Sequence, residues 1–133
     1  MDEYLVNRVL TASPQQLHLM VVDGCIRHTR QAELAIAEQR WDDSHTTLTE
    51  ARAHLTHLLS GINPQADDEF LVNLRGLFKL AYKLMTLADL QRDAASLPTA
   101  LAILTEHRET WKLVIEATTD SAAPASDSLK LSA

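Results

Sequence analysis

The sequence predicts an all-α protein: an antiparallel up-and-down four-helix bundle, preceded by a short N-terminal helical segment and followed by a disordered C-terminal tail. Apolar residues make up 46% of the 133 residues, whereas there are only three glycines and four prolines, too few for the many turns of a β-sandwich. Apolar side chains recur at steps of three and four residues, which is the helical period. We therefore expect one bundle domain over residues 1–117 and a tail over residues 118–133.

The chain opens with residues 2–10, whose apolar side chains would meet on one or two helical turns. A helix this short is not stable alone in water, so we expect the segment either to lie over one groove of the bundle or to be mobile. The first long helix should begin after Ser13, because Ser13 can cap it, Pro14 has the φ angle of a first helical residue, and Gln16 can bond back to the cap. Its apolar period continues to about Arg40.

Three further helices follow, each with start or stop signals of its own. Asp43 is a candidate cap for the second helix, and Gly61 with the proline that follows ends it. Acidic residues 67–69 fall in the first turn of the third helix, where carboxylates complement the helix dipole. The fourth helix begins with Pro98 in its first turn and ends near Ala117. Because the connections are short, successive helices should run antiparallel.

Composition and charge exclude several classes of partner. The net charge of −6 argues against nucleic acid or an anionic membrane as the main partner, since both require clustered Lys and Arg. There is no apolar run of about 18 or more residues and no basic-then-apolar leader, so we expect no membrane insertion and a cytoplasmic location. The single cysteine, Cys25, cannot form an intrachain disulfide, which suits a reducing compartment.

The sequence gives little indication of catalysis, and we expect no enzyme activity, no cofactor and no metal. No histidine has a glutamate three residues before it, which is the pattern of di-iron bundles. His54 and His57 are one turn apart, as are Cys25 and His28, and metal ligands can have this spacing. An exposed or half-buried position beside an apolar seam explains the histidines better. Cys25 has apolar neighbours and resembles a small core residue more than a nucleophile.

The first and third long helices carry more apolar residues than one bundle seam must bury. The surplus residues are Leu19, Val22 and Ile26 on the first, and Leu80, Leu87 and Leu90 on the third, which also carries Leu71 and Phe78 seven residues apart. They either complete the core of a broad bundle or line grooves that receive an amphipathic segment of another chain. Gly24, in the middle of a helix, costs about 1 kcal/mol relative to alanine; the close approach of another backbone would offset this cost.

The opening of the chain also resembles the FliS family of flagellar export chaperones. The residues that carry the resemblance are Tyr4, Asn7, Val9, Thr11-Ala12-Ser13-Pro14, Leu17, Met20, Asp23-Gly24 and Arg27. The resemblance extends over roughly residues 4–117 and is dense only in the first 27. The family usually has an aromatic residue where this chain has Val22, so a partner contact that needs that ring is in question here.

The resemblance implies a cytosolic chaperone that binds the disordered C-terminal segment of flagellin, prevents premature polymerisation and delivers it to the flagellar type III export apparatus. Flagellar regulators, such as an anti-sigma factor or a cochaperone, and export-gate components are further partners that it implies. The candidate partner-binding residues are then Tyr4, Leu5, Asn7, Val9, Leu19, Val22, Ile26, Leu71, Phe78, Leu80 and Leu87. We further expect the first segment to occupy part of a groove in the free protein and to be displaced by the client.

Two other classes of protein remain open from the residues alone. A non-enzymatic oligomerising or adaptor bundle would have the same periodicity. A histidine phosphotransfer module is also a four-helix bundle, but the basic and glycine-rich surroundings expected of its phosphorylated histidine are absent around all six histidines of this chain. Arg75, Lys79 and Lys83 share one side of the third helix, and a solvated face explains them better than an anion or partner site.

Overall fold

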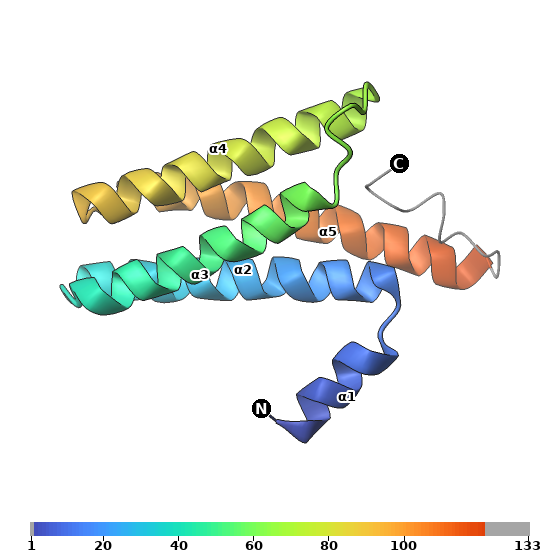
Figure 1. The fold of residues 1–133 in the computed structure, drawn as a ribbon, viewed down its shortest axis with the longest axis horizontal. Coiled ribbons are helices and arrows are strands. Elements are labelled where there is room, and N and C mark those ends of the chain that lie inside the picture. The colour runs from blue at the N-terminus through green and yellow to red at the C-terminus, as the bar shows by residue number, and fades with distance from the viewer. Residues whose placement is uncertain (1, 122–133) are drawn as a thin grey trace.

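A computed structural model describes residues 2–121, with the side chains of residues 2–118. This part of the chain consists of helices α1 (Glu3–Thr11), α2 (Pro14–Ala37), α3 (Trp41–Ser60), α4 (Glu69–Gln91), the 3-10 turn η1 (Ala94–Ser96) and α5 (Leu97–Ser121). Helix α2 packs against α3 and α5, and α4 packs against the same two helices (Figure 1). The predicted all-α, up-and-down bundle is therefore confirmed. No helix in the described range has both the length and the hydropathy needed to cross a bilayer.

The capping box predicted at the start of α2 is present. The Ser13 hydroxyl accepts a hydrogen bond from the Gln16 amide at 3.1 Å, and the Ser13 amide donates to Gln16 Oε1 at 3.0 Å. Two amide donors at the helix end are thereby satisfied. The other end of α2 comes earlier than the predicted Arg40, because Gln39 adopts a left-handed backbone conformation with φ of 57°. Helix α3 then begins at Trp41, after Arg40 and without a side-chain cap, so the predicted cap at Asp43 was wrong and Asp43 lies in the first turn.

The later helix ends follow the predictions with one clear exception. Helix α4 begins after Asp68, whose carboxylate accepts a hydrogen bond from the Leu71 amide at 3.2 Å. Helix α5 continues beyond Ala117 to Ser121, so the predicted tail begins inside a helix and that boundary was wrong. The remainder of the predicted tail, residues 122–133, lies outside the described residues.

The core also contains residues that the sequence suggested were surplus. Val22 and Phe78 are completely buried, so their assignment to a partner-binding surface was wrong. Ile26 is 5% exposed and packs mainly in the core. The reason is that α2 contacts two neighbours, and both of its apolar stripes are covered. Gly24 is in close contact as predicted, but with a side chain: a Cβ there would lie 2.8 Å from Nε2 of His54 on α3.

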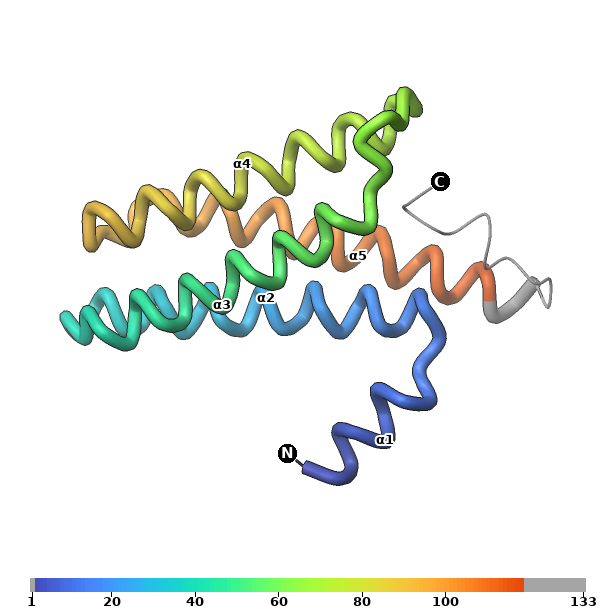
Figure 2. Tube along the Cα trace, in the orientation of Figure 1, coloured from blue at the N-terminus to red at the C-terminus, as the bar shows by residue number. Residues whose placement is uncertain are grey.

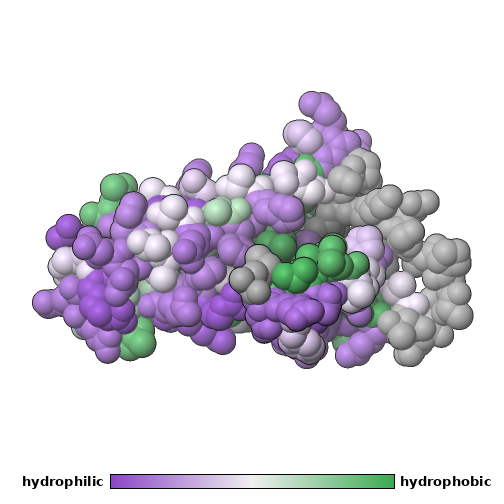
Figure 3. Space-filling view, turned by 60° about the horizontal axis from the view of Figure 1, so that its bottom comes forward, coloured by the Kyte–Doolittle hydropathy of each residue, from purple (hydrophilic) through white to green (hydrophobic). Residues whose placement is uncertain are grey.

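Helix α1 stands away from the bundle and has no buried residue. Figures 1 and 2 show it leaving the N-terminal end of α2 at an angle, and Figure 3 shows hydrophobic residues gathered over it. Tyr4 is 67% exposed and Leu10 is 76% exposed. The expectation that this segment covers a groove was therefore wrong. Ala12 and Ser13 are both extended, and the capping box holds Ser13 in that conformation, which directs α1 outward.

Candidate functional site

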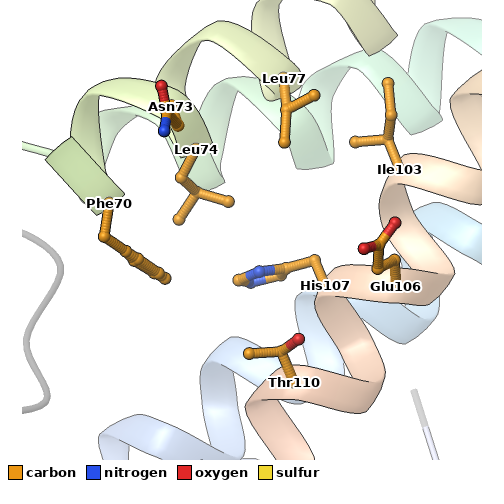
Figure 4. A pocket seen from close by; sticks show the side chains of 8 residues that line it. All are labelled: Phe70, Asn73, Leu74, Leu77, Ile103, Glu106, His107 and Thr110. Atoms are coloured by element: carbon orange, nitrogen blue, oxygen red, sulfur yellow. The ribbon is translucent and has the colours of Figure 1, made fainter.

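The main candidate site is an apolar groove between α4 and α5, which we call the α4/α5 groove. It has a volume of about 320 Å³. Its lining residues are Phe70, Asn73, Leu74 and Leu77 from α4, and Ile103, Glu106, His107 and Thr110 from α5. In Figure 4 the rings of Phe70 and His107 point toward the same space from opposite helices. A concave, mainly apolar surface with a few polar groups at its edge is typical of a binding site.

The floor of this groove is a cluster of rings held by hydrogen bonds. His107 Nε2 lies 2.8 Å from Nε2 of His18 on α2, so one imidazole donates a hydrogen bond to the other. The His107 ring also meets Phe78 edge to face, with 5.1 Å between the ring centroids. Trp111 donates its indole N–H to the carbonyl of Gln15 at 2.9 Å. These contacts join α2, α4 and α5 beneath the groove and fix its shape.

Both histidines of the cluster are neutral at physiological pH. Burial, together with the smaller effect of the positive charges that His107 and His57 would carry, lowers the pKa of His18 to about 3. Burial also lowers the pKa of His107 to about 4. Burial has this effect because a charged imidazolium loses its hydration and gains no carboxylate partner here. The groove therefore has a neutral, hydrogen-bonded floor.

Exposed apolar side chains continue along both helices beside the groove. Leu80, Leu87 and Leu90 are exposed on α4, and Leu113 is exposed on α5. Large aliphatic side chains at such spacing on one side of a helix are unusual on a surface that meets only water. Leu80 and Leu113 lie one turn beyond the lining residues Leu77 and Thr110, and Leu87 lies on the same side of α4 as Leu80.

The structure thus separates the predicted partner-binding residues into three groups. Leu80 and Leu87 are exposed beside the α4/α5 groove, and Tyr4, Leu5, Asn7 and Val9 are exposed on α1. Leu19 and Leu71 are half-buried, with Leu71 packed against the core. The remaining three, Val22, Ile26 and Phe78, are core residues.

Sequence reasoning missed most of the groove itself. Phe70 and Leu77 share an apolar row with Leu74 and Ala81, which are buried, so periodicity alone places all four in the core. His107 could have been noticed from the sequence, because Trp111 follows it by one helical turn and the two rings lie on the same face of the helix. No local signal in the sequence shows that α4 and α5 diverge enough to leave Phe70 and Leu77 half exposed.

A second groove runs along the other side of α5, between α5 and α2, and we call it the α2/α5 groove. It has a volume of about 640 Å³. It is lined by Asp23, Ile26, Arg27, Arg30, Gln31, Leu34, Thr105, Arg108 and Glu109. Unlike the first groove, it is rich in arginine. Arg108 donates a hydrogen bond to Asp23, which joins α5 to α2 across its floor.

The described part of the chain offers neither a cluster of metal ligands nor a reactive cysteine. Residues 2–118 contain no group of three or more His, Cys, Asp or Glu side chains arranged to hold a metal ion. Cys25 is buried, and burial raises the pKa of its thiol to about 12. Its Sγ–H donates to the Ala51 carbonyl at 3.4 Å. A neutral, buried thiol is a poor nucleophile.

These features define an all-α helical bundle with an uncovered, mainly apolar groove between α4 and α5. Residues 1–118 match the family described as "Flagellar protein FliS", and the chain belongs to this family. It is also 26% identical over 113 residues to the flagellar secretion chaperone FliS of Bacillus subtilis (strain 168), an alignment that covers 85% of this chain and 84% of that protein. The resemblance noted in the opening residues is thus confirmed over the whole bundle.

Proposed function

We propose that this protein is a flagellar secretion chaperone that binds the C-terminal segment of flagellin in the cytoplasm, prevents its premature polymerisation and delivers it to the flagellar type III export apparatus. Membership of the FliS family supports this role, as does the name of the Bacillus subtilis relative. The structural observation that supports it best is the α4/α5 groove. There the bundle leaves Phe70 44% exposed and Leu77 45% exposed.

The uncovered side chains are sufficient for binding of moderate strength. Complete burial of a Leu or Phe side chain stabilises by about 1.5–3 kcal/mol. Phe70, Leu77, Leu80 and Leu87 are each a little under half exposed, so covering all four would contribute roughly 3–6 kcal/mol. The apolar side chains of the client add a similar amount. Ordering a flexible client opposes this gain, so the complex can still dissociate at the export apparatus.

The mechanism is masking by mass action. A client segment bound in the groove cannot present its apolar residues to another flagellin molecule. Because the chaperone binds only the unassembled segment, its presence shifts the equilibrium away from polymerisation in proportion to its free concentration. Release on delivery then returns the segment to a state that can assemble.

Helix α1 offers a separate surface for delivery or regulation. Tyr4, Leu5, Asn7 and Val9 are exposed and lie outside the α4/α5 groove. A partner could therefore bind them while the client occupies the groove. An export-gate component or a flagellar regulator has the appropriate role, because either must recognise the loaded chaperone. Removal of residues 2–11 should then impair export while leaving the affinity for flagellin within about twofold; a larger loss of affinity would assign α1 to the client instead.

Calorimetric titration with flagellin tests the groove directly. Leu77→Glu places a charge in the groove, and Val72→Glu is its matched control, since Val72 lies on the same helix outside the lining and is 39% exposed. We expect Leu77→Glu to weaken binding at least tenfold and Val72→Glu to leave it near the wild-type value, with circular dichroism confirming that both variants fold. Flagellin lacking its last few dozen residues should not bind. Equal binding of full-length and truncated flagellin would refute the proposed function.

A further inference from the structure

The same stretch of α5 lines both grooves described above. Ile103, His107 and Thr110 face the α4/α5 groove, whereas Thr105 and Arg108 face the α2/α5 groove. The two grooves therefore lie at the same level on opposite sides of one helix. A helix with its side chains is about 10–12 Å across, so the path round half of its circumference is about 16–19 Å, a distance that about five or six residues of extended chain can span. A polypeptide leaving the first groove can thus enter the second without a long connection.

The α2/α5 groove carries positive charge that its own residues do not neutralise. Arg108 pairs with Asp23 and, at 3.2 Å, with Glu109. The three arginines and two carboxylates of the lining leave this groove with a net charge of +1. Arg27 and Arg30 are exposed and form no ion pair with any residue of the described range 2–118. Two free guanidinium groups are notable on a chain whose net charge is −6.

An apolar contact lies beside these two arginines. Leu34 follows Arg27 by seven residues and Arg30 by four, so all three lie on one side of α2. Leu34 is 56% exposed, and Ile26 forms a buried apolar part of the same groove. The surface is therefore complementary to a segment that carries two carboxylates and an aliphatic side chain. The aliphatic side chain should follow the carboxylates by about one turn if the segment is helical, or by about two to three residues if it is extended.

We propose that the client segment held in the α4/α5 groove continues across α5 and places acidic side chains against Arg27 and Arg30, with an aliphatic side chain on Leu34. This inference rests on the proposed function. It is supported by the continuity of the two grooves along α5 and by the uncompensated positive charge at the second. Exposed ion pairs are individually weak, so this contact sets the register and direction of the client more than its total affinity.

The test compares binding of the flagellin C-terminal segment to three forms of the full chain. These are the wild type, Arg27→Glu/Arg30→Glu, and Lys79→Glu/Arg92→Glu, which makes the same change in net charge at two exposed residues outside both groove linings. Reversing both arginines replaces two weak attractions by repulsions of similar size, so we expect the Kd to rise about tenfold in low salt. The wild type should lose affinity as salt is raised, and the arginine variant should show a much smaller change, because salt screens exposed charges.

Several results would overturn the inference. Wild-type affinity and salt dependence in the arginine variant would show that the client does not reach this groove, while leaving the proposed function intact. An equal loss in the Lys79→Glu/Arg92→Glu variant would assign the effect to net charge. No binding by the wild type would refute the proposed function itself. Lysine substitutions at the acidic residues of the client should restore binding to the arginine variant; failure of every such substitution to do so would contradict direct pairing.

Discussion

Lowering the pH from 6 to 5 should destabilise the bundle through His18 and His107. In the folded protein the pKa values of these residues are lowered to about 3 and about 4. In the unfolded chain both would return to about 6.5. The unfolded state therefore binds more protons than the folded state at pH values between the folded-state pKa values of about 3 and 4 and the unfolded-state value of about 6.5. The stability that comes from keeping both rings neutral is fully present above pH 6.5 and is lost as the pH falls.

The size of the effect follows from proton linkage. Between pH 6 and pH 5 both histidines become almost fully charged in the unfolded chain and stay neutral in the folded one. Each contributes a loss of about 1 kcal/mol over this interval, or about 2 kcal/mol for the pair. Since small domains are stable by only about 5–15 kcal/mol, this is a substantial fraction. A loss of this size should lower the Tm by roughly 6–8 °C.

Urea unfolding at both pH values, followed by tryptophan fluorescence, measures the effect. The probe is well placed because the Trp111 ring packs against His18 with 4.3 Å between the ring centroids. His18→Gln preserves a hydrogen-bonding side chain that does not titrate, and it should reduce the pH-dependent loss to about 1 kcal/mol. His57→Gln is the control, because His57 is exposed. If the wild type and His18→Gln lose the same stability, buried imidazole is not the cause and the reasoning is refuted.

Three further predictions concern glycine and cysteine. Nothing lies within 4 Å of a Cβ at Gly76, so Gly76→Ala should raise the free energy of unfolding by about 1 kcal/mol; a lower Tm would contradict this. Gly24→Ala should stabilise little or not at all in the wild type, where the new Cβ meets His54, yet by about 1 kcal/mol in a His54→Ala background. A double-mutant cycle without coupling would rule out that contact. Cys25 should react with a thiol reagent at pH 8 only as fast as the protein unfolds, and rapid labelling of the folded protein would show that the thiol is accessible.

The helices of this protein were predictable because their signals are local. Ser13 and Gln16 determine where α2 begins through hydrogen bonds within one turn. The end of α5 was less predictable, because the composition changes after Ala117 although the helix does not end there. Thr118 still donates its hydroxyl to the carbonyl of Val114 at 2.7 Å. A polar residue of this kind can therefore continue a helix that is already formed, since adding one residue is easier than starting a new turn.

The sequence by itself determined the all-α class, the order of the helices and the excess of apolar surface, because these depend on side chains a few residues apart. Only the tertiary structure decided which apolar stripes are covered. Val22 and Phe78 are buried while Phe70 and Leu77 are left open, and this depends on how each helix is rotated and how closely its neighbours approach. The hydrophobic effect has no direction, so a periodic pattern shows that a helix face is apolar without showing which neighbour, or which partner, covers it.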